Sequence, residues 1–401
     1  MNVIIISMDS GKKNVAVLFG GKSPEHEVSI ITGVQVIKSI DLNTYNIVPV
    51  YVAKDGRWYH SERFFDMGVF KNLETVPFVS QEVYLPADPN NSYLWGVARS
   101  FFGGQFKVKV DVFFPCFHGG SGENGAFQGL FELCEKPYVG SEVLGSALGM
   151  DKVVCKDIFR AHNIPTAPHA HYHKRTVEDK TGWVVSDLES KFKYPMFVKP
   201  ANSGSSIGVT KVRDANELKA GLELAAAFSS KVLVEESIEN AMEINISVMG
   251  NSGADLSLSA CEEVFHSGKF LSYDDKYKSE DGKSQGMASA KRKILTDLDQ
   301  ESLNAIHETA KKVYTCLNCS GLVRVDFLVR GKQIFVIEVN TLPGSMAFYL
   351  WKASGLSFCA LTTKLIELAE KQFEAKNKNI STLSSNILKD FNPGIKNSKL
   401  G

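Results

Sequence analysis

The first part of the chain alternates apolar strands with a helical segment. Three apolar runs lead into glycine-containing turns, at 14–21, 45–52 and 110–117. The segment 26–40 reads as a helix between the first two runs, and this order predicts an open parallel α/β domain. Ligands of such sheets bind beyond the carboxyl ends of the strands, so the polar loops at 20–27 and 118–125 are candidate sites.

Beyond Met150 the pattern favours antiparallel strands. A helix is expected at 151–164, ending before a proline. Strands are expected at 193–212 (two, joined by a glycine–serine loop), 231–238, 243–250 and 321–340, the last being a hairpin. The polar, charged stretch from Ser267 to Arg292 is a candidate mobile loop.

Composition narrows the class of protein without identifying it. The 401 residues contain 45 basic and 45 acidic side chains, and this neutral balance gives no argument for a nucleic-acid or membrane partner. No apolar stretch approaches the ~18 residues of a membrane span, and the N-terminus lacks the features of a signal peptide. Seven scattered cysteines are typical of reduced thiols, so we expect a cytoplasmic protein.

The hairpin at 321–340 carries the strongest chemical signal. With a turn near its centre, Asp326 falls opposite Glu338, and the alternation of strand side chains adds Arg324 and Asn340 to the same face. Glu338 lies in an apolar run, where a buried carboxylate is costly unless it is paired or bound to a metal. Two carboxylates and a carboxamide suit Mg²⁺, which we favour over an arginine–carboxylate pair on a solvated face.

Three polar loops are weaker signals when each is taken alone. The loop at 203–206 offers backbone amides and hydroxyls that suit phosphate, although a plain flexible loop explains it equally simply. The turns around His118 and Glu123 would let a ligand approach the backbone, but a strand-to-helix turn needs the same glycines. Glu25 and Glu27 stand at a helix start. They either bind a substrate ammonium or only interact favourably with the helix dipole.

Taken together and in this order, these stretches resemble the ATP-grasp superfamily and, within it, the D-alanine–D-alanine ligases. The resemblance runs from about Val15 to about Leu368, and its most specific stretches are GGKSPEHEVS, HGGSGENGAFQGLFELCEKPYVGS, SALGMDK, VKPANSGSSIGV, DDKY and RVDF…IEVNTLPG. It implies a three-domain fold: 1–148 as an N-terminal α/β substrate domain with an insertion at about 64–105, 149–238 as the central subdomain, and 239–373 as the C-terminal catalytic domain. Residues 374–401 are expected to be a disordered polar tail.

The resemblance also implies which side chains hold the cofactors, ATP and two Mg²⁺ or Mn²⁺ ions. Phosphate contacts are matched by Lys152, Lys199, Lys276, Ser205 and Ser206. The hinge that reads adenine, partly through its backbone, and the carboxylate on the ribose are matched by Glu235, Glu236 and Glu243. The metal ligands are matched by Asp326, Glu338 and Asn340.

The implied reaction phosphorylates one D-alanine carboxylate, and the amine of a second D-alanine then attacks the acyl phosphate. Arg324 and the backbone N–H of Gly344 match the groups that stabilise the oxyanion. Glu25 matches the group that receives the first substrate's ammonium, with His118 nearby. A hydrogen-bonded triad that closes the loop over the site is matched by Glu25, Ser205 and Tyr277. The expected product is D-alanyl-D-alanine for peptidoglycan precursors, and a homodimer is the family expectation.

One departure keeps alternatives open. Where the family often has a serine that holds the second substrate's carboxylate, this chain has Tyr349. A related ligase that joins a different pair of small amino or hydroxy acids is therefore the nearest alternative. A nucleotide-binding module without catalysis is the alternative of another class, and the complete set of site residues argues against it.

Overall fold

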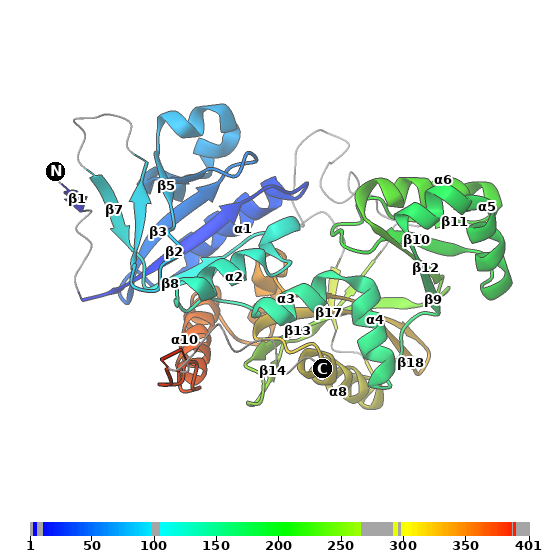
Figure 1. The fold of residues 1–401 in the computed structure, drawn as a ribbon. Helices are drawn as coiled ribbons and strands as arrows, with labels where there is room; N and C mark the ends of the chain where they lie inside the picture. Colours follow the sequence, from blue (N-terminus) through cyan, green and yellow to red (C-terminus); the bar gives the residue numbers. More distant parts are fainter. Residues whose placement is uncertain are drawn as a thin grey trace.

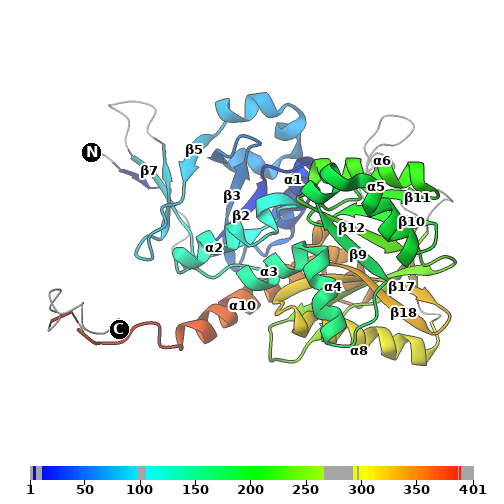
Figure 2. The same ribbon diagram turned by 45° about the vertical axis from the view of Figure 1, so that its right-hand side comes forward.

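The computed structural model describes residues 3–5, 11–97, 105–265, 292–295, 298–386 and 388–389. Lys276, Tyr277 and nearly all of the predicted mobile loop lie outside these residues. Within them the chain forms three β-sheets with their own helices (Figure 1), and the view in Figure 2 separates the N-terminal sheet from the other two. The mixed α/β class expected from the sequence is confirmed.

One end of the N-terminal sheet is parallel, as expected, because β2 pairs in parallel with β3 and with the edge strand β8. The segment predicted as an insertion adds antiparallel strands on one side, so the whole sheet is mixed. The strand order is β1-β7-β6-β5-β4-β3-β2-β8. The strands are β1 (Val3–Ile5), β2 (Lys13–Gly20), β3 (Tyr45–Val52), β4 (Trp58–His60), β5 (Gln81–Tyr84), β6 (Tyr93–Gly96), β7 (Gln105–Lys109) and β8 (Val112–Pro115).

Helices cover this sheet and lead out of it. They are α1 (His26–Ser39), α2 (Ala126–Leu133) and α3 (Val143–Met150), with short 3-10 turns η1 (Glu62–Phe65), η2 (Met67–Lys71), η3 (Leu73–Phe78) and η4 (Gly120–Gly122). The helix α1 packs closely on β2, where a Cβ on Gly33 would lie 2.4 Å from Cγ of the buried Phe19. Glycine at this position therefore sets the distance between helix and sheet.

The second sheet is antiparallel and has the order β11-β10-β12-β9. Its strands are β9 (His169–His173), β10 (Met196–Pro200), β11 (Thr210–Val212) and β12 (Lys231–Glu236). One face carries a core of apolar side chains shared with α5 (Lys174–Lys191) and α6 (Ala215–Phe228). The helix α4 (Lys152–Ala161), predicted from the sequence, precedes this sheet, and its N-terminus is capped by Asp151.

The third sheet is also antiparallel and has the order β16-β15-β13-β17-β18, with β14 paired to β13. Its strands are β13 (Met242–Gly250), β14 (Ser257–Leu258), β15 (Cys261–Val264), β16 (Arg292–Leu295), β17 (Gly321–Arg330) and β18 (Gln333–Asn340). The helix α8 (Gln300–Cys316) packs on one face. The chain then continues through η6 (Gly344–Ala347), α9 (Phe348–Ala353) and α10 (Phe358–Asn377), which extends beyond the expected boundary at 373.

Candidate active site

A cavity of about 380 Å³ lies where the second and third sheets meet, bridged by the connection from β12 to β13. Apolar side chains from both sheets form part of its wall, namely Phe197, Val209, Leu328, Phe335 and Val336. Residues predicted to bind nucleotide or metal also line it: Lys152, Lys199, Ser206, Glu235, Glu236, Glu243, Asp326 and Glu338. Most of the predicted nucleotide site is thus gathered in one hollow with apolar walls and charged ends, which suits a ligand with a flat ring and an anionic tail.

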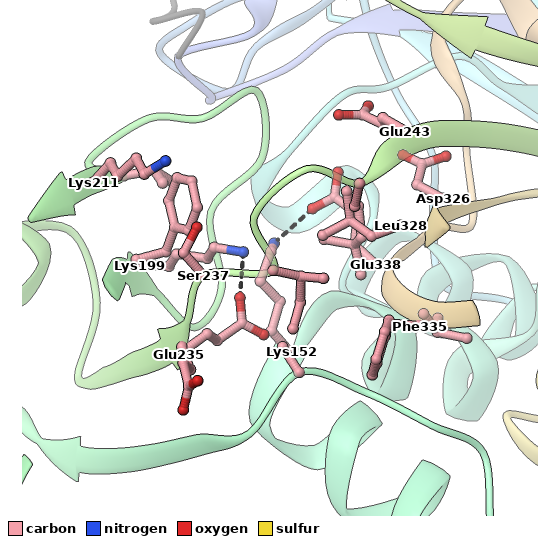
Figure 3. Close-up of a pocket in the computed structure, with 18 of the residues that line it drawn as sticks. Lys152, Lys199, Lys211, Glu235, Ser237, Glu243, Asp326, Leu328, Phe335 and Glu338 are labelled. Carbon is pink, nitrogen blue, oxygen red and sulfur yellow. Dashed lines mark ion pairs between the residues drawn. The ribbon is translucent and has the colours of Figure 1, made fainter. Parts of the chain in front are cut away.

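Two lysines reach into this cavity from different elements, as Figure 3 shows. Lys152, the first residue of α4, donates from Nζ to the carbonyl oxygen of Ser203 at 2.8 Å and lies 3.5 Å from Glu338 Oε2. Lys199 extends from β10 and pairs with Glu235. The start of α4 and the second sheet therefore each place one ammonium group in the same cavity.

Glu235 is a buried carboxylate between two lysines. Its Oε1 pairs with Nζ of Lys156, and its Oε2 pairs with Nζ of Lys199. Burial alone would raise the pKa of Glu235, but the charges of the two lysines more than offset this and lower the pKa to about 2. The side chain is thus engaged by lysines, and the predicted role of Glu235 in reading adenine would have to use its backbone.

The predicted polar face of the hairpin is confirmed. Asp326 pairs in register with Glu338, and Arg324 pairs with Asn340. Arg324 donates to both oxygens of Asp326, at 2.6 and 2.7 Å, while Asn340 Nδ2 donates to Asp326 Oδ2 at 3.0 Å. The same row continues across the sheet through Asn245, which pairs with Asp326 on one side.

The expected burial of Glu338 is wrong. Its side chain is 33% exposed, whereas that of Asp326, the buried carboxylate of the pair, is 5% exposed. The reason is the position of the strands, because β18 is the edge of the sheet and β17 lies inside it. A register shift between Asp326 and Phe327 accompanies this arrangement and is what places Asp326 beside Glu338 rather than Ile337.

The side-chain oxygens of Asp326, Glu338 and Asn340 are of the kind that bind a divalent cation such as Mg²⁺. Burial raises the pKa of Asp326 to about 6, with the Glu338 and Glu243 carboxylates adding to the effect and Arg324 opposing it. Such a concentration of carboxylates would be relieved by a hard cation with oxygen ligands. Over the residues that the structure describes, no group of three or more His, Cys, Asp and Glu side chains has metal-binding geometry, so Asn340 would have to complete the set.

A second polar cluster lies at the N-terminal sheet. Glu25, beside the start of α1, is only 7% exposed and accepts a hydrogen bond from Ser205 Oγ. Burial raises the pKa of Glu25, and the nearby Glu123 carboxylate raises it further. Gly119 and Gly204 make room for this carboxylate, since a Cβ on either would lie 2.7 or 2.6 Å from Glu25 Oε2. A cationic ligand would favour the ionised form of Glu25.

The loop at 203–206 joins the two clusters. Ser203 and Ser206 line the cavity, whereas Ser205 reaches Glu25. Ser205 and Ser206 have φ values of 48° and 59°, in the left-handed region that turns successive backbone N–H groups toward one side. The loop is therefore more than a flexible connection between β10 and β11.

His118 belongs to a chain of contacts that reaches η6. Its Nε2 lies 2.8 Å from Thr32 Oγ1, which in turn accepts a hydrogen bond from the backbone N–H of Ser345 at 3.1 Å. The Thr32 hydroxyl has a second lone pair as well as one hydrogen, so this contact suits either tautomer of His118, whose Nδ1 lies 3.8 Å from Glu123 Oε1. This chain fixes the segment of Gly344 against the N-terminal sheet.

The segment after Gly344 is held in an unusual backbone conformation. Ser345, Met346 and Ala347 have φ values of 51°, 52° and 44°, which non-glycine residues rarely adopt. Such strain persists only where the surroundings enforce it, and it is common at functional sites.

Tyr349 donates its hydroxyl hydrogen to Glu262 Oε1 at 2.7 Å. Glu262 is 1% exposed, and its Oε1 also accepts a hydrogen bond from Asn245 Nδ2 at 3.2 Å. A tyrosine has only one hydroxyl hydrogen, so in this arrangement it is not available to a substrate carboxylate. That Tyr349 binds the second substrate in place of the usual serine stays a prediction. Its hydrogen bond to Glu262 limits the ways in which the hydroxyl could do so.

Sequence reasoning missed Lys156, Thr32 and Glu262. Lys156 offered one signal, its spacing of four residues from Lys152, which places both on the same side of α4. The partners of Thr32 and Glu262 in these contacts are distant in the sequence, so no local pattern marked either residue.

Two family models match the chain. The model described as "D-ala D-ala ligase N-terminus" matches residues 14–141, and the one described as "D-ala D-ala ligase C-terminus" matches residues 158–367. A D-alanine--D-alanine ligase of Acetivibrio thermocellus is 38% identical over 378 residues, covering 90% of this chain and 97% of the relative.

Solved structures similar to this chain come from the same family. The D-alanine-D-alanine ligase of Coxiella burnetii has a TM-score of 0.76 at 28% identity, covering 92% of this chain and 97% of that one. The VanG D-Ala:D-Ser ligase of Enterococcus faecalis has a TM-score of 0.73 at 32% identity, covering 89% of this chain and 99% of that one. The similarity therefore extends over both clusters described above.

Proposed function

The chain belongs to the D-alanine–D-alanine ligase family, and from this premise we propose that it joins two molecules of D-alanine at the expense of ATP, making D-alanyl-D-alanine for peptidoglycan precursors. The observation that carries the proposal is the meeting of a lysine-bearing cavity with the Arg324–Asp326–Glu338 face of the third sheet. The first is suited to a nucleoside triphosphate, and the second to the charge that develops during phosphoryl and acyl transfer.

ATP would occupy the cavity between the second and third sheets. Its base would lie against the apolar wall formed by Phe197, Leu328 and Phe335, next to the connection from β12 to β13. Its phosphates would meet Lys152 and Lys199, with the backbone of the 203–206 loop on the same side. Lys276, predicted to be another phosphate contact, lies outside the described residues.

Mg²⁺ or Mn²⁺ would be held by Asp326, Glu338 and Asn340, which the carboxylate-rich chemistry of that face supports. When bound, the metal would neutralise phosphate charge during transfer. Lys152 Nζ lies 3.5 Å from Glu338 Oε2, which links the proposed phosphate contact to the proposed metal ligand.

In the first step a carboxylate oxygen of the first D-alanine attacks the γ-phosphorus, ADP leaves, and an acyl phosphate forms. Glu25 would receive the ammonium of this substrate, which is supported by its burial and its raised pKa. In the second step the amine of the other D-alanine, after losing a proton, attacks the acyl carbon, and phosphate leaves. Arg324 and the N–H of Gly344 would stabilise the oxyanion of the tetrahedral intermediate.

A different acceptor is the second candidate function. Tyr349 stands where a serine is usual and its hydroxyl is bonded to Glu262, and one similar structure is that of a D-Ala:D-Ser ligase. D-serine in place of the second D-alanine is therefore the acceptor to compare first.

The deciding experiment measures phosphate release from ATP with Mg²⁺, with mass spectrometry of the product. D-alanine would be supplied alone and then with D-serine or D-lactate. Formation of D-alanyl-D-alanine as the main product supports the proposal. Phosphate release only with a second acceptor would select the alternative ligase, and ATP binding without turnover on the whole panel would favour a non-catalytic module.

Two further expectations remain proposals. Among the helices in the described part of the chain, none is both long and apolar enough to cross a membrane. The use of ATP fits the cytoplasmic location expected from the sequence, and the homodimer is an expectation that size-exclusion chromatography with light scattering would test.

A further inference from the structure

Lys156 is one of the most buried charged residues in the described part of the chain, at 1% exposure of the whole residue. It lies one helical turn after Lys152 in α4 and pairs with Oε1 of Glu235. Burying a lysine costs desolvation energy, and removing one partner of a buried ion pair costs more because it leaves an uncompensated charge. Such a pair therefore calls for an explanation.

The three charges of this cluster are unequally exposed. All three residues line the cavity, but the side chains of Lys156 and Glu235 are only 2% and 4% exposed, whereas that of Lys199 is 13% exposed. Each lysine takes a different oxygen of the carboxylate. The sum of one negative and two positive charges is one positive charge, and its most exposed carrier is Lys199. Figure 3 shows the ion pair between Lys199 and Glu235.

A neighbouring histidine does not change this sum. His169 lies close enough for both Lys156 and Glu235 to act on it, and burial lowers its pKa, so its ring is neutral near neutral pH. Without Lys156, the buried carboxylate would be left with Lys199 alone, and that pair would have no net charge toward a ligand.

Resting on the ATP-dependent function proposed above, we propose that Lys156 is a positioning residue for nucleotide binding: by occupying one oxygen of Glu235, it lets this carboxylate orient Lys199 without cancelling the positive charge that Lys199 presents to the phosphates. Lys156 itself does not touch the nucleotide in this scheme. Its contribution passes through Glu235, with which it pairs. The side chain of Lys156 lines the cavity but exposes almost none of its surface there.

The test is isothermal titration of the full-length protein with ATP and Mg²⁺, without D-alanine. Lys156→Gln removes the charge but retains an N–H donor for Glu235. A unit charge at roughly 10 Å in a medium of effective dielectric constant about 20 changes an association constant on the order of tenfold, so we expect the Kd for ATP to rise by about that factor. In turnover the KM for ATP should rise similarly, with kcat changed by less than about threefold.

The double variant Lys156→Gln/Glu235→Gln separates charge from packing. It restores one net positive charge, on Lys199, and keeps an amide oxygen beside it. We expect it to bind ATP more tightly than Lys156→Gln and within about threefold of the native protein. A purely structural role for Lys156 would make the double variant no better than the single one, and that result would overturn the proposal.

Lys311→Gln is the matched control, because Lys311 loses the same charge from an exposed position in α8, where it pairs with Glu308. ATP affinity should not change in this variant. If Lys156→Gln does not fold, as judged by circular dichroism, Lys156→Arg and the double variant decide: both should retain near-native affinity, and a loss in either refutes the inference. Absence of ATP binding by the native protein would instead refute the proposed function.

Discussion

Arg324 is the residue whose replacement should affect catalysis most directly. It is largely buried, at 14% side-chain exposure, and both of its hydrogen bonds to Asp326 are short and charge-assisted. Arg324→Ala therefore has two separate consequences: the loss of a donor for the proposed oxyanion and the loss of the countercharge of a buried carboxylate.

The two effects have different magnitudes and different readouts. Loss of one oxyanion donor lowers kcat by about 10²- to 10³-fold, or about 3–4 kcal/mol of transition-state stabilisation. Removing one partner of a buried ion pair destabilises the fold by about 3–5 kcal/mol, although Asn340 still donates to Asp326 Oδ2 and reduces this cost. Binding of ATP without metal should be unchanged, since Arg324 is not among the residues that line the nucleotide cavity.

The assay couples phosphate release with quantification of the dipeptide, alongside chemical denaturation of each variant. Arg324→Lys is the matched control: it keeps the positive charge but loses the two-pronged geometry, so its kcat should lie about tenfold or more above that of Arg324→Ala. The denaturation experiment shows how much of the loss is unfolded protein.

The reasoning would be refuted by a folded Arg324→Ala variant that forms dipeptide within about threefold of the native rate. In that case the oxyanion would be stabilised elsewhere, and the pair with Asp326 would be structural. A fall in affinity for metal-free ATP as large as the fall in kcat would also contradict the assignment, because it would place Arg324 in nucleotide binding.

Three more predictions concern the surrounding framework. The pKa of Glu235 is lowered from 4.5 to about 2, so its ionised form contributes stability that is fully present above pH 4.5 and is lost as the pH falls through 2. This contribution, ~3 kcal/mol, should appear in the difference in unfolding free energy between the native protein and Glu235→Gln, which should be constant from pH 7 to about 5 and shrink below that. Thr32→Val should lower kcat about tenfold by breaking the contact with His118 and the N–H of Ser345, whereas Thr32→Ser, measured in the same assay, should retain activity. Gly33→Ala should lower the melting temperature despite the higher helix propensity of alanine, because a Cβ 2.4 Å from Phe19 Cγ costs about 1–3 kcal/mol of packing strain against a gain of about 1 kcal/mol.

The parts of the site that the sequence predicts well are local in the chain. Asp326 and Glu338 are separated by a short hairpin, so alternation and a turn position suffice to bring them together. The glycine–serine loop is similarly readable, because residues 203–206 lie between two adjacent strands. Even here, a regular ladder continued from the observed pair of Arg330 and Gln333 would place Asp326 opposite Ile337. The irregularity between Asp326 and Phe327 supplies the pairing with Glu338 that the sequence predicted.

The burial of a side chain is harder to predict from local sequence patterns, because it depends on which strands become neighbours. The apolar run around Glu338 suggested a buried strand, but β18 has a partner on one side only. Asp326 is the costlier carboxylate because β13 covers the other side of β17. The order of strands follows from the packing of the whole domain, and no pattern within the hairpin contains it.

The residues that were missed share one property: each acts on a partner supplied by a distant part of the chain. Lys156 meets Glu235 across 79 positions, and Thr32 meets Ser345 across 313. Their chemistry is unremarkable in isolation, since a lysine in a helix and a threonine in a helix are both ordinary surface residues by composition. Burial changes their meaning, because a polar group removed from water must find a partner, and that requirement identifies Lys156 and Thr32 as parts of the site once the sheets are assembled.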